Sequence, residues 1–317
     1  MIRRLRYVFL TIVGLAILAA LSGAAYQSIE SRAEARRSPE AGRPVDIGGY
    51  LLKINCTGNG SPTVILEARL GDVSIEWSRV QPEIAKLARV CSYDRAGYGS
   101  SNAGPIPRTN LQIAKKLHTL LQNAREAPPY LLVVHSFGGY NVRVFNGNYP
   151  DELSGIVLVD STQEDQYELL PPAWGKIYSS ELRRQKRQAM RAPVFVDLGV
   201  ARWMYGARFG GNAYLILQSK YRRARASELE SIKTSAEQAR AAGNISDKPL
   251  IVLTGGKNSG EILSNSLTRQ DFDEFRRIWV EQLQRRLAPS PLEGNKSPCA
   301  TADTIFRRNA RTRSLTR

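Results

Sequence analysis

Histidine and cysteine are scarce in this sequence. Its 317 residues contain two histidines, His118 and His135, and three cysteines, Cys56, Cys91 and Cys299. Zinc sites in proteins use three or four histidine, cysteine or carboxylate ligands, usually at short spacings. Two isolated histidines and three widely separated cysteines make no such cluster, so we expect neither a metal nor another cofactor.

Acidic residues are also in the minority. The 29 Asp and Glu residues stand against 45 Lys and Arg, which gives a formal net charge of +16. Such a charge can favour nucleic acid or an anionic membrane surface as a partner. No nucleic-acid-binding module is visible, and the arginines are scattered through helical stretches and both ends of the chain. A solvated basic face therefore explains the charge better than a nucleic-acid site, and we expect no nucleic-acid partner.

Charge is missing altogether from Tyr7 to Ala25, nineteen residues that follow Arg3, Arg4 and Arg6. A run of this length is close to what a helix needs to cross a bilayer, with its positive flank inside. A cleaved signal peptide is the alternative, because Ser22-Gly-Ala24 offers small residues for processing. We favour the uncleaved anchor. Both alternatives carry the remaining chain across the membrane, as an anchored extracytoplasmic domain or as a secreted one.

The most informative stretch runs from Tyr130 to Tyr140. An apolar, largely β-branched segment leads to Ser136, and a helix-like segment follows at 141–145. A strand, a sharp turn with a serine at its apex and a helix form the layout of a nucleophile elbow. The helix starts against the strand with almost no gap, so the positions two before and two after the serine are usually glycine. Here they are Val134 and Gly138.

Three further stretches accompany predicted strands: Glu67–Gly71, Val90–Ser100 and Gly155–Thr162. Together with the elbow they resemble, in order and spacing, the α/β-hydrolase fold family from about residue 45 to residue 287. The resemblance implies an α/β fold with a doubly wound, mostly parallel sheet and a helical cap inserted after the sixth strand. Strands that alternate with helices also predict parallel βαβ units without reference to a family.

The chain divides accordingly. The character changes at 163–245, where arginine-rich helical stretches replace strands; a long disordered insertion is the alternative, against which the content of Trp174, Trp203, Met204 and Tyr205 argues. The predicted parts are 1–26 anchor or signal peptide, 27–44 linker, 45–162 and 246–288 hydrolase core, 163–245 cap, and 289–317 aberrant, disordered tail.

Local signals add three expectations. Cys56 closes the second predicted strand and Cys91 opens the fourth; these strands are neighbours in the family's order, so a disulfide is possible, and two separate thiols are the alternative. Residues 75–88 are amphipathic and predicted to be helical, with an interruption at a proline. Asp271 with Glu274 three residues on resembles a capping box that opens a helix.

The resemblance also implies site residues. Ser136 is the nucleophile, and the N–H groups of Phe137 and Leu70 form the oxyanion hole. The family usually has glycine where this chain has Arg69. For the acid, the position after the seventh strand holds Asn258, so we favour Asp160 at the end of the sixth strand; its ordinary alternative is a loop or helix cap.

The base is missing from the expected place. His135 precedes Ser136 and is expected to point away from the active face, while His118 is expected on the solvated flank of a helix. The family's histidine follows an eighth strand, yet Pro289–Arg317 has no apolar run that could form one. Read from Ala300 in a shifted frame, the codons permit Asp-Ser-Gly-His-Asp-Ile-Pro, which resembles the family's histidine loop. We interpret the tail as a frameshifted replacement; an unrelated disordered tail is the alternative, and sequencing the gene tests this.

We therefore predict a serine hydrolase that acts on an ester or other acyl bond of a small molecule, weak or inactive in this chain because the triad histidine is missing. The alternative is a non-catalytic α/β-hydrolase-like protein that binds a small apolar ligand under its cap or serves as an envelope scaffold. The acyl substrate and the oligomeric state cannot be predicted from the sequence.

Overall fold

A seven-stranded sheet forms the centre of the molecule. The computed structural model describes residues 2–37, 41–209, 213–243, 245, 248–255 and 268–279 of the chain. Its strands are β1 Arg43–Asp46, β2 Leu51–Thr57, β3 Thr63–Glu67, β4 Val90–Tyr93, β5 Tyr130–His135, β6 Leu153–Val159 and β7 Leu250–Leu253. They lie in the order β1-β2-β4-β3-β5-β6-β7.

The sheet is mostly parallel. The β1–β2 and β2–β4 pairs are antiparallel, and the pairs from β4 through β3, β5 and β6 to β7 are parallel. Parallel strands end at the same edge, so the segments that follow β3, β5 and β6 meet there. The register places Glu67 beside Val134 and His135 beside Val159. Three of the four predicted stretches, Glu67–Gly71, the elbow and Gly155–Thr162, are thereby brought to one edge of the sheet.

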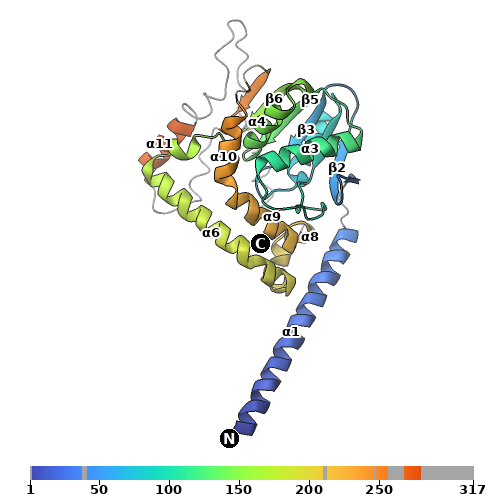
Figure 1. Ribbon diagram of the computed structural model, residues 1–317, viewed down its shortest axis with the longest axis vertical. Coiled ribbons are helices and arrows are strands. Elements are labelled where there is room, and N and C mark those ends of the chain that lie inside the picture. Colours follow the sequence, from blue (N-terminus) through green and yellow to red (C-terminus); the bar gives the residue numbers. More distant parts are fainter. Residues whose placement is uncertain are drawn as a thin grey trace, which may run out of the picture.

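The helices cover both faces of the sheet and extend beyond it (Figure 1). They are α1 Ile2–Arg37, η1 Ser74–Trp77, α2 Gln81–Ile84, α3 Asn110–Ala124, α4 Gly138–Asn148, η2 Pro150–Glu152, α5 Gln166–Leu169, α6 Pro172–Asp197, α7 Val200–Phe209, α8 Ala213–Ile216, α9 Ser219–Glu230, α10 Ile232–Ala241 and α11 Arg269–Arg277. Apolar side chains of α3 and α4 pack with the strands in the largest core cluster, which includes Leu117, Leu132 and Phe145. A second cluster, with Leu66 and Trp77, covers the face toward η1 and α2.

A helical insertion follows β6, as the sequence predicts. Helices α5 to α10 lie between β6 and β7 in the chain, and α6 packs along α9. Figure 1 shows α6 as a long diagonal helix, with α8 and α9 between it and the sheet. The expected α/β fold with a cap after the sixth strand is therefore confirmed, whereas the domain boundaries remain predictions.

The amino-terminal helix α1 projects from the body of the molecule (Figure 1). It is long and apolar enough to cross a membrane, and a signal sequence near the amino terminus would have the same properties. The helix continues to Arg37, through residues that the sequence predicts to be an aperiodic linker. This part is helical because it contains good helix formers and contacts the cap, where Gln27 donates to the carbonyl oxygen of Leu217 at 2.6 Å.

Two further predictions need correction, and one is confirmed. The capping box of α11 lies one turn earlier than predicted: Thr268 is the cap and Asp271 the third helical residue, because the Thr268 hydroxyl accepts the N–H of Asp271. The helical stretch predicted at 75–88 is interrupted, as expected, but the break lies between η1 and the short α2, and Pro82 is in the first turn of α2. Cys56 and Cys91 face each other in the β2–β4 register and form a disulfide. Asn258 and the predicted tail at 289–317 lie outside the described residues.

Candidate active site

The turn between β5 and α4 has the geometry of a nucleophile elbow. Ser136 has a φ of 49°, in the left-handed region that residues with a Cβ rarely adopt. Its N–H donates to the carbonyl oxygen of Val159 at 3.0 Å, and its own carbonyl oxygen accepts the N–H of Thr162 at 3.0 Å. Bonds to the end of β6 and the loop after it thus hold the turn from both sides.

The close approach of helix and strand explains Gly138. A Cβ at this position would lie 2.8 Å from the Cβ of Val134, closer than real Cβ atoms approach. The two positions that flank the serine by two residues therefore touch each other. One glycine gives enough room for the larger Val134, so the departure from the usual pair of glycines is accommodated.

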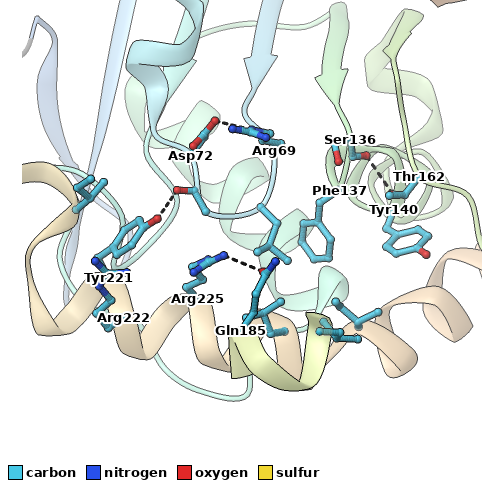
Figure 2. Close-up of a pocket in the computed structure, with 16 residues that line it drawn as sticks. Arg69, Asp72, Ser136, Phe137, Tyr140, Thr162, Gln185, Tyr221, Arg222 and Arg225 are labelled. Carbon is cyan, nitrogen blue, oxygen red and sulfur yellow. Dashed lines mark hydrogen bonds and ion pairs between the residues drawn. The ribbon is translucent and has the colours of Figure 1, made fainter. Parts of the chain in front are cut away.

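Ser136 lines a cavity of about 570 Å³ between the sheet edge and the cap. The loop after β3 contributes Arg69 to Asp72, the elbow contributes Ser136 and Phe137, and α9 contributes Tyr221, Arg222 and Arg225. We call this space the Ser136 cavity. Figure 2 shows Ser136 and Thr162 toward one end of it and Tyr221 and Arg222 toward the other.

Both predicted oxyanion donors line the Ser136 cavity. Among the described residues, the N–H groups of Phe137 and Leu70 make no hydrogen bond. The N–H of Arg69, in contrast, donates to Glu76 at 3.1 Å, and its guanidinium pairs with Asp72 at 2.6 Å. The arginine that replaces the family's glycine thus points its charge to neighbours in its own loop. Two uncommitted N–H groups on residues that line the same cavity as Ser136 are suited to an oxyanion.

A buried ionic network braces this loop and the cap. Arg95 donates to the carbonyl oxygens of Ala68 at 2.6 Å and Arg69 at 3.0 Å. Its Nε also pairs at 3.2 Å with Glu228 of α9, and Arg108 pairs with the same carboxylate at 3.0 Å. Burial opposes the charge of Glu228, yet the two arginines and a hydrogen bond from Tyr98 lower the pKa of this glutamate. The cap is therefore joined to the core by a charge that is fully buried.

Glu67, at the end of β3, differs from Glu228 in its pKa. Its carboxylate is buried, accepts a hydrogen bond from Asn141 and lies 3.6 Å from Arg95. Burial raises the pKa of Glu67 to about 7, because the attraction of Arg95 and the hydrogen bonds offset only part of the lost hydration. Arg95 also pairs with Glu228, and it lies closer to that carboxylate, at 3.2 Å, than to Glu67, at 3.6 Å.

Asp160 lies where the sequence predicts, directly after β6. It has a φ of 43°, and its Oδ1 accepts the N–H of Gly255 at 3.1 Å and the indole N–H of Trp279 at 3.2 Å. It is not among the described residues that line the Ser136 cavity. Its role as the acid remains a prediction.

Each of the two histidines contacts a glutamate. His135 lies 2.5 Å from Glu76 through Nδ1, and His118 lies 2.9 Å from Glu152 through Nε2. The expected solvated position of His118 is wrong: its side chain is 14% exposed and stacks on Tyr149 with ring centroids 3.8 Å apart. Neither histidine is among the described residues that line the Ser136 cavity.

Sequence reasoning missed the contribution of the cap to the site. Arg222, Arg225 and Glu228 belong to one arginine-rich stretch of α9 in which periodicity alone does not separate inward from outward positions. The apolar residues Tyr221, Ala224 and Leu229 were the signal available in the sequence, and the structure shows that all three are buried.

Comparison with known proteins agrees with this geometry. Residues 62–245 match the model of the alpha/beta hydrolase fold family. The chain is 26% identical over 165 residues to the uncharacterized protein YbdG of Bacillus subtilis, a match that covers 51% of each protein. It is 27% identical over 128 residues to the 2-hydroxymuconate semialdehyde hydrolase of a Pseudomonas species, covering 40% of this chain and 45% of that protein. The chain thus spans about half of the length of these relatives.

The fold itself is found in solved structures. A candidate acyltransferase from Salmonella enterica has a TM-score of 0.58 at 17% sequence identity, covering 88% of this chain and 98% of that one. An identity this low establishes a shared architecture and leaves the reaction open.

Proposed function

Since the chain belongs to the α/β-hydrolase fold family, we propose that it is a serine hydrolase that cleaves an ester or another acyl bond of a small molecule. One observation carries the proposal: Ser136, at the apex of an elbow with a φ of 49°, opens into a cavity lined also by Leu70 and Phe137. The Ser136 Oγ attacks the acyl carbon, and the N–H groups of Phe137 and Leu70 donate to the oxygen that becomes negative. The leaving group departs, and water then releases the acyl group from the serine.

A base must accept the proton of the Ser136 hydroxyl, and in the proposed site Asp160 would orient that base. Both histidines of the chain contact glutamates, and the described lining of the cavity contains no imidazole. Without a base, an enzyme of this kind keeps a residual acceleration of roughly 10³–10⁴ over water from its oxyanion hole and its binding site. We therefore expect slow turnover by this chain.

The location of the reaction is part of the same proposal. We place the domain outside the cytoplasm, attached to a membrane by α1. A long apolar amino-terminal helix and the Cys56–Cys91 disulfide support this, because disulfides persist in oxidising compartments.

A fluorophosphonate probe tests the nucleophile. It labels an activated serine, so we expect slow labelling of the native full-length chain and none of Ser136→Ala, measured by mass spectrometry of the modified peptide. Ser100→Ala, which changes an exposed serine outside the cavity, is the control and should label like the native chain. Equal labelling of Ser136→Ala and the native chain would contradict the proposal.

The second candidate function is a non-catalytic protein that holds a small ligand in the Ser136 cavity. The absence of an imidazole from the described lining of this cavity favours it. Complete inertness of native Ser136 toward the probe, together with saturable ligand binding, would select this function over the enzyme.

A further inference from the structure

The Ser136 cavity contains three arginines whose charges are compensated to different degrees. Arg69 pairs with Asp72 at 2.6 Å, and this ion pair neutralises the carboxylate that also lines the cavity. Arg225 donates from Nη2 to the neutral side chain of Gln185 at 2.8 Å. Arg222 makes no ion pair with any carboxylate in the part of the chain that the structure describes, and its guanidinium carbon lies over the ring of Tyr221, 5.3 Å from the ring centroid.

The two α9 arginines that line the cavity, Arg222 and Arg225, are also short of hydrogen bonds. The Nε atoms of Arg222 and Arg225 are both buried and have no hydrogen-bond partner among the described residues. Burial lowers the pKa of Arg222, and the positive charge of Arg225 lowers it further. Burying a cation without a counter-ion is costly, and an unmade hydrogen bond adds to that cost.

We propose that Arg222 and Arg225 form a subsite for an anionic group of the substrate, a carboxylate or phosphate at the end remote from the scissile acyl bond. The inference deepens the proposed function, and the identification of the bound anion as part of a substrate rests on that function. An anion would supply the missing counter-charge and accept from the unpartnered Nε–H groups, and guanidinium groups bind planar and tetrahedral oxyanions well. Figure 2 shows Arg222 at the end of the cavity away from Ser136, with Arg225 between them.

Equilibrium binding to the full-length chain in detergent micelles tests the subsite with a matched pair of probes. Monomethyl adipate carries one ester and one carboxylate, and dimethyl adipate carries two esters and no charge. By isothermal titration calorimetry, we expect the native chain to bind the monoester roughly tenfold or more tightly than the diester. Arg222→Gln and Arg225→Gln should each lose most of this preference while binding the diester unchanged.

The same helix offers the control. Arg223 lies between the residues of the subsite but is exposed, so Arg223→Gln removes an equal charge and should keep the preference. A merely structural arginine would destabilise the protein when replaced, whereas Arg222→Gln should leave the Tm unchanged or raise it. Equal affinities of the native chain for the two probes, or equal losses in the Arg222 and Arg223 variants, would overturn the proposal.

Competing ions identify the anion and separate the two proposals. Competition by inorganic phosphate assigns the subsite to a tetrahedral oxyanion, competition by acetate alone assigns it to a carboxylate, and competition by neither contradicts an anion site. Ser136→Ala should keep the preference for the monoester, because binding does not require the nucleophile. Failure of the serine labelling with this preference intact would therefore remove the hydrolase and leave the subsite.

Discussion

Ser136 holds a backbone conformation that costs a residue with a Cβ on the order of 1 kcal/mol. The cost is borne because hydrogen bonds to Val159 and Thr162 fix the turn on both sides. These bonds fix the backbone of Ser136, and therefore the position from which its hydroxyl projects, between the strand and the helix. Strain at a cavity wall, combined with uncommitted neighbouring N–H groups, is typical of a nucleophile rather than of a packing residue.

Glu67 gives the protein a specific dependence on pH. Its pKa in the folded state, about 7, lies above the ordinary 4.5, so the folded state binds its proton more tightly than the unfolded state does. The resulting stabilisation is fully present below about pH 4.5 and is lost as the pH rises through about 7. Glu67→Gln cannot ionise but can still accept the hydrogen bond from Asn141. We expect its Tm to fall less than the native Tm between pH 5 and pH 8. At pH 8 the variant should have the higher Tm of the two.

The exposed Glu83→Gln is the matched control for that measurement and should follow the native curve. A Glu67→Gln variant that is less stable than the native chain at pH 8 would show that the ionised carboxylate is the favoured form. Thermal unfolding followed by circular dichroism at each pH suffices.

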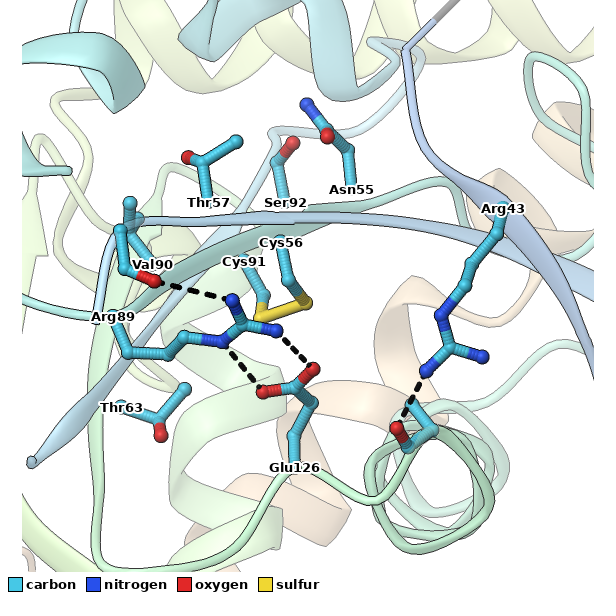
Figure 3. The surroundings of a disulfide bond; sticks show 12 residues. Arg43, Asn55, Cys56, Thr57, Thr63, Arg89, Val90, Cys91, Ser92 and Glu126 are labelled. Atoms are coloured by element: carbon cyan, nitrogen blue, oxygen red, sulfur yellow. Dashed lines mark hydrogen bonds and ion pairs between the residues drawn. A yellow bond between two sulfur atoms is a disulfide. The ribbon is translucent and has the colours of Figure 1, made fainter. Parts of the chain in front are cut away.

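At the level of elements, β2 and β4 are joined twice, by their backbone ladder and by the Cys56–Cys91 disulfide. Figure 3 shows the bond beside the guanidinium of Arg89, which forms two hydrogen bonds to Glu126. The sulfurs and this carboxylate lie close enough together to resemble a metal site. The sulfurs are bonded to each other and the carboxylate is paired, so the cluster serves the structure.

Removal of the disulfide should lower stability measurably. The two cysteines are 35 residues apart, and closing a loop of that length restricts the unfolded chain by about 3–4 kcal/mol. We expect Cys56→Ser combined with Cys91→Ser to lower the urea midpoint, and dithiothreitol to lower the midpoint of the native chain but not that of the double variant. Identical midpoints for the native and variant chains would mean that the bond does not form in solution.

The sequence allows the elements that rest on local patterns to be predicted, and it fails where distant partners decide. The turn between β5 and α4 follows from an apolar run that ends at Ser136 and from the glycine at 138. The cap of α11 was predicted at the wrong residue because Thr268 and Asp271 satisfy the same spacing rule one turn earlier. Glu228 pairs with an arginine 133 positions away, and neither composition nor periodicity encodes that contact.

For the whole molecule, a buried arginine adds a second link between α1 and the cap. Arg202 of α7 is 3% exposed, pairs with Glu34 at 2.7 Å, and donates to Gln27 at 2.8 Å and Ser31 at 2.9 Å. These contacts attach the amino-terminal helix to the insertion rather than to the sheet. The predicted linker at 27–44 and the cap, which the sequence suggests are separate parts, therefore support each other.

Replacement of Arg202 tests that link. We expect Arg202→Met to destabilise the full-length chain by about 2 kcal/mol, because Glu34 loses its charged partner. The measurement is thermal unfolding in detergent, with Arg187→Met as the control because Arg187 is exposed on α6. A loss no greater than that of the control would mean that the contact between α1 and the cap adds nothing to stability.

The attachment of α9 to the core through Glu228 has a consequence for how a ligand is received. Because buried ion pairs hold α9 against the core, its position is fixed when the chain folds. This helix therefore does not have to close over a ligand after the ligand binds. The entropic cost of ordering the Ser136 cavity is then met during folding and does not weaken ligand binding. A preformed cavity of this kind discriminates between ligands by their shape and charge as they enter.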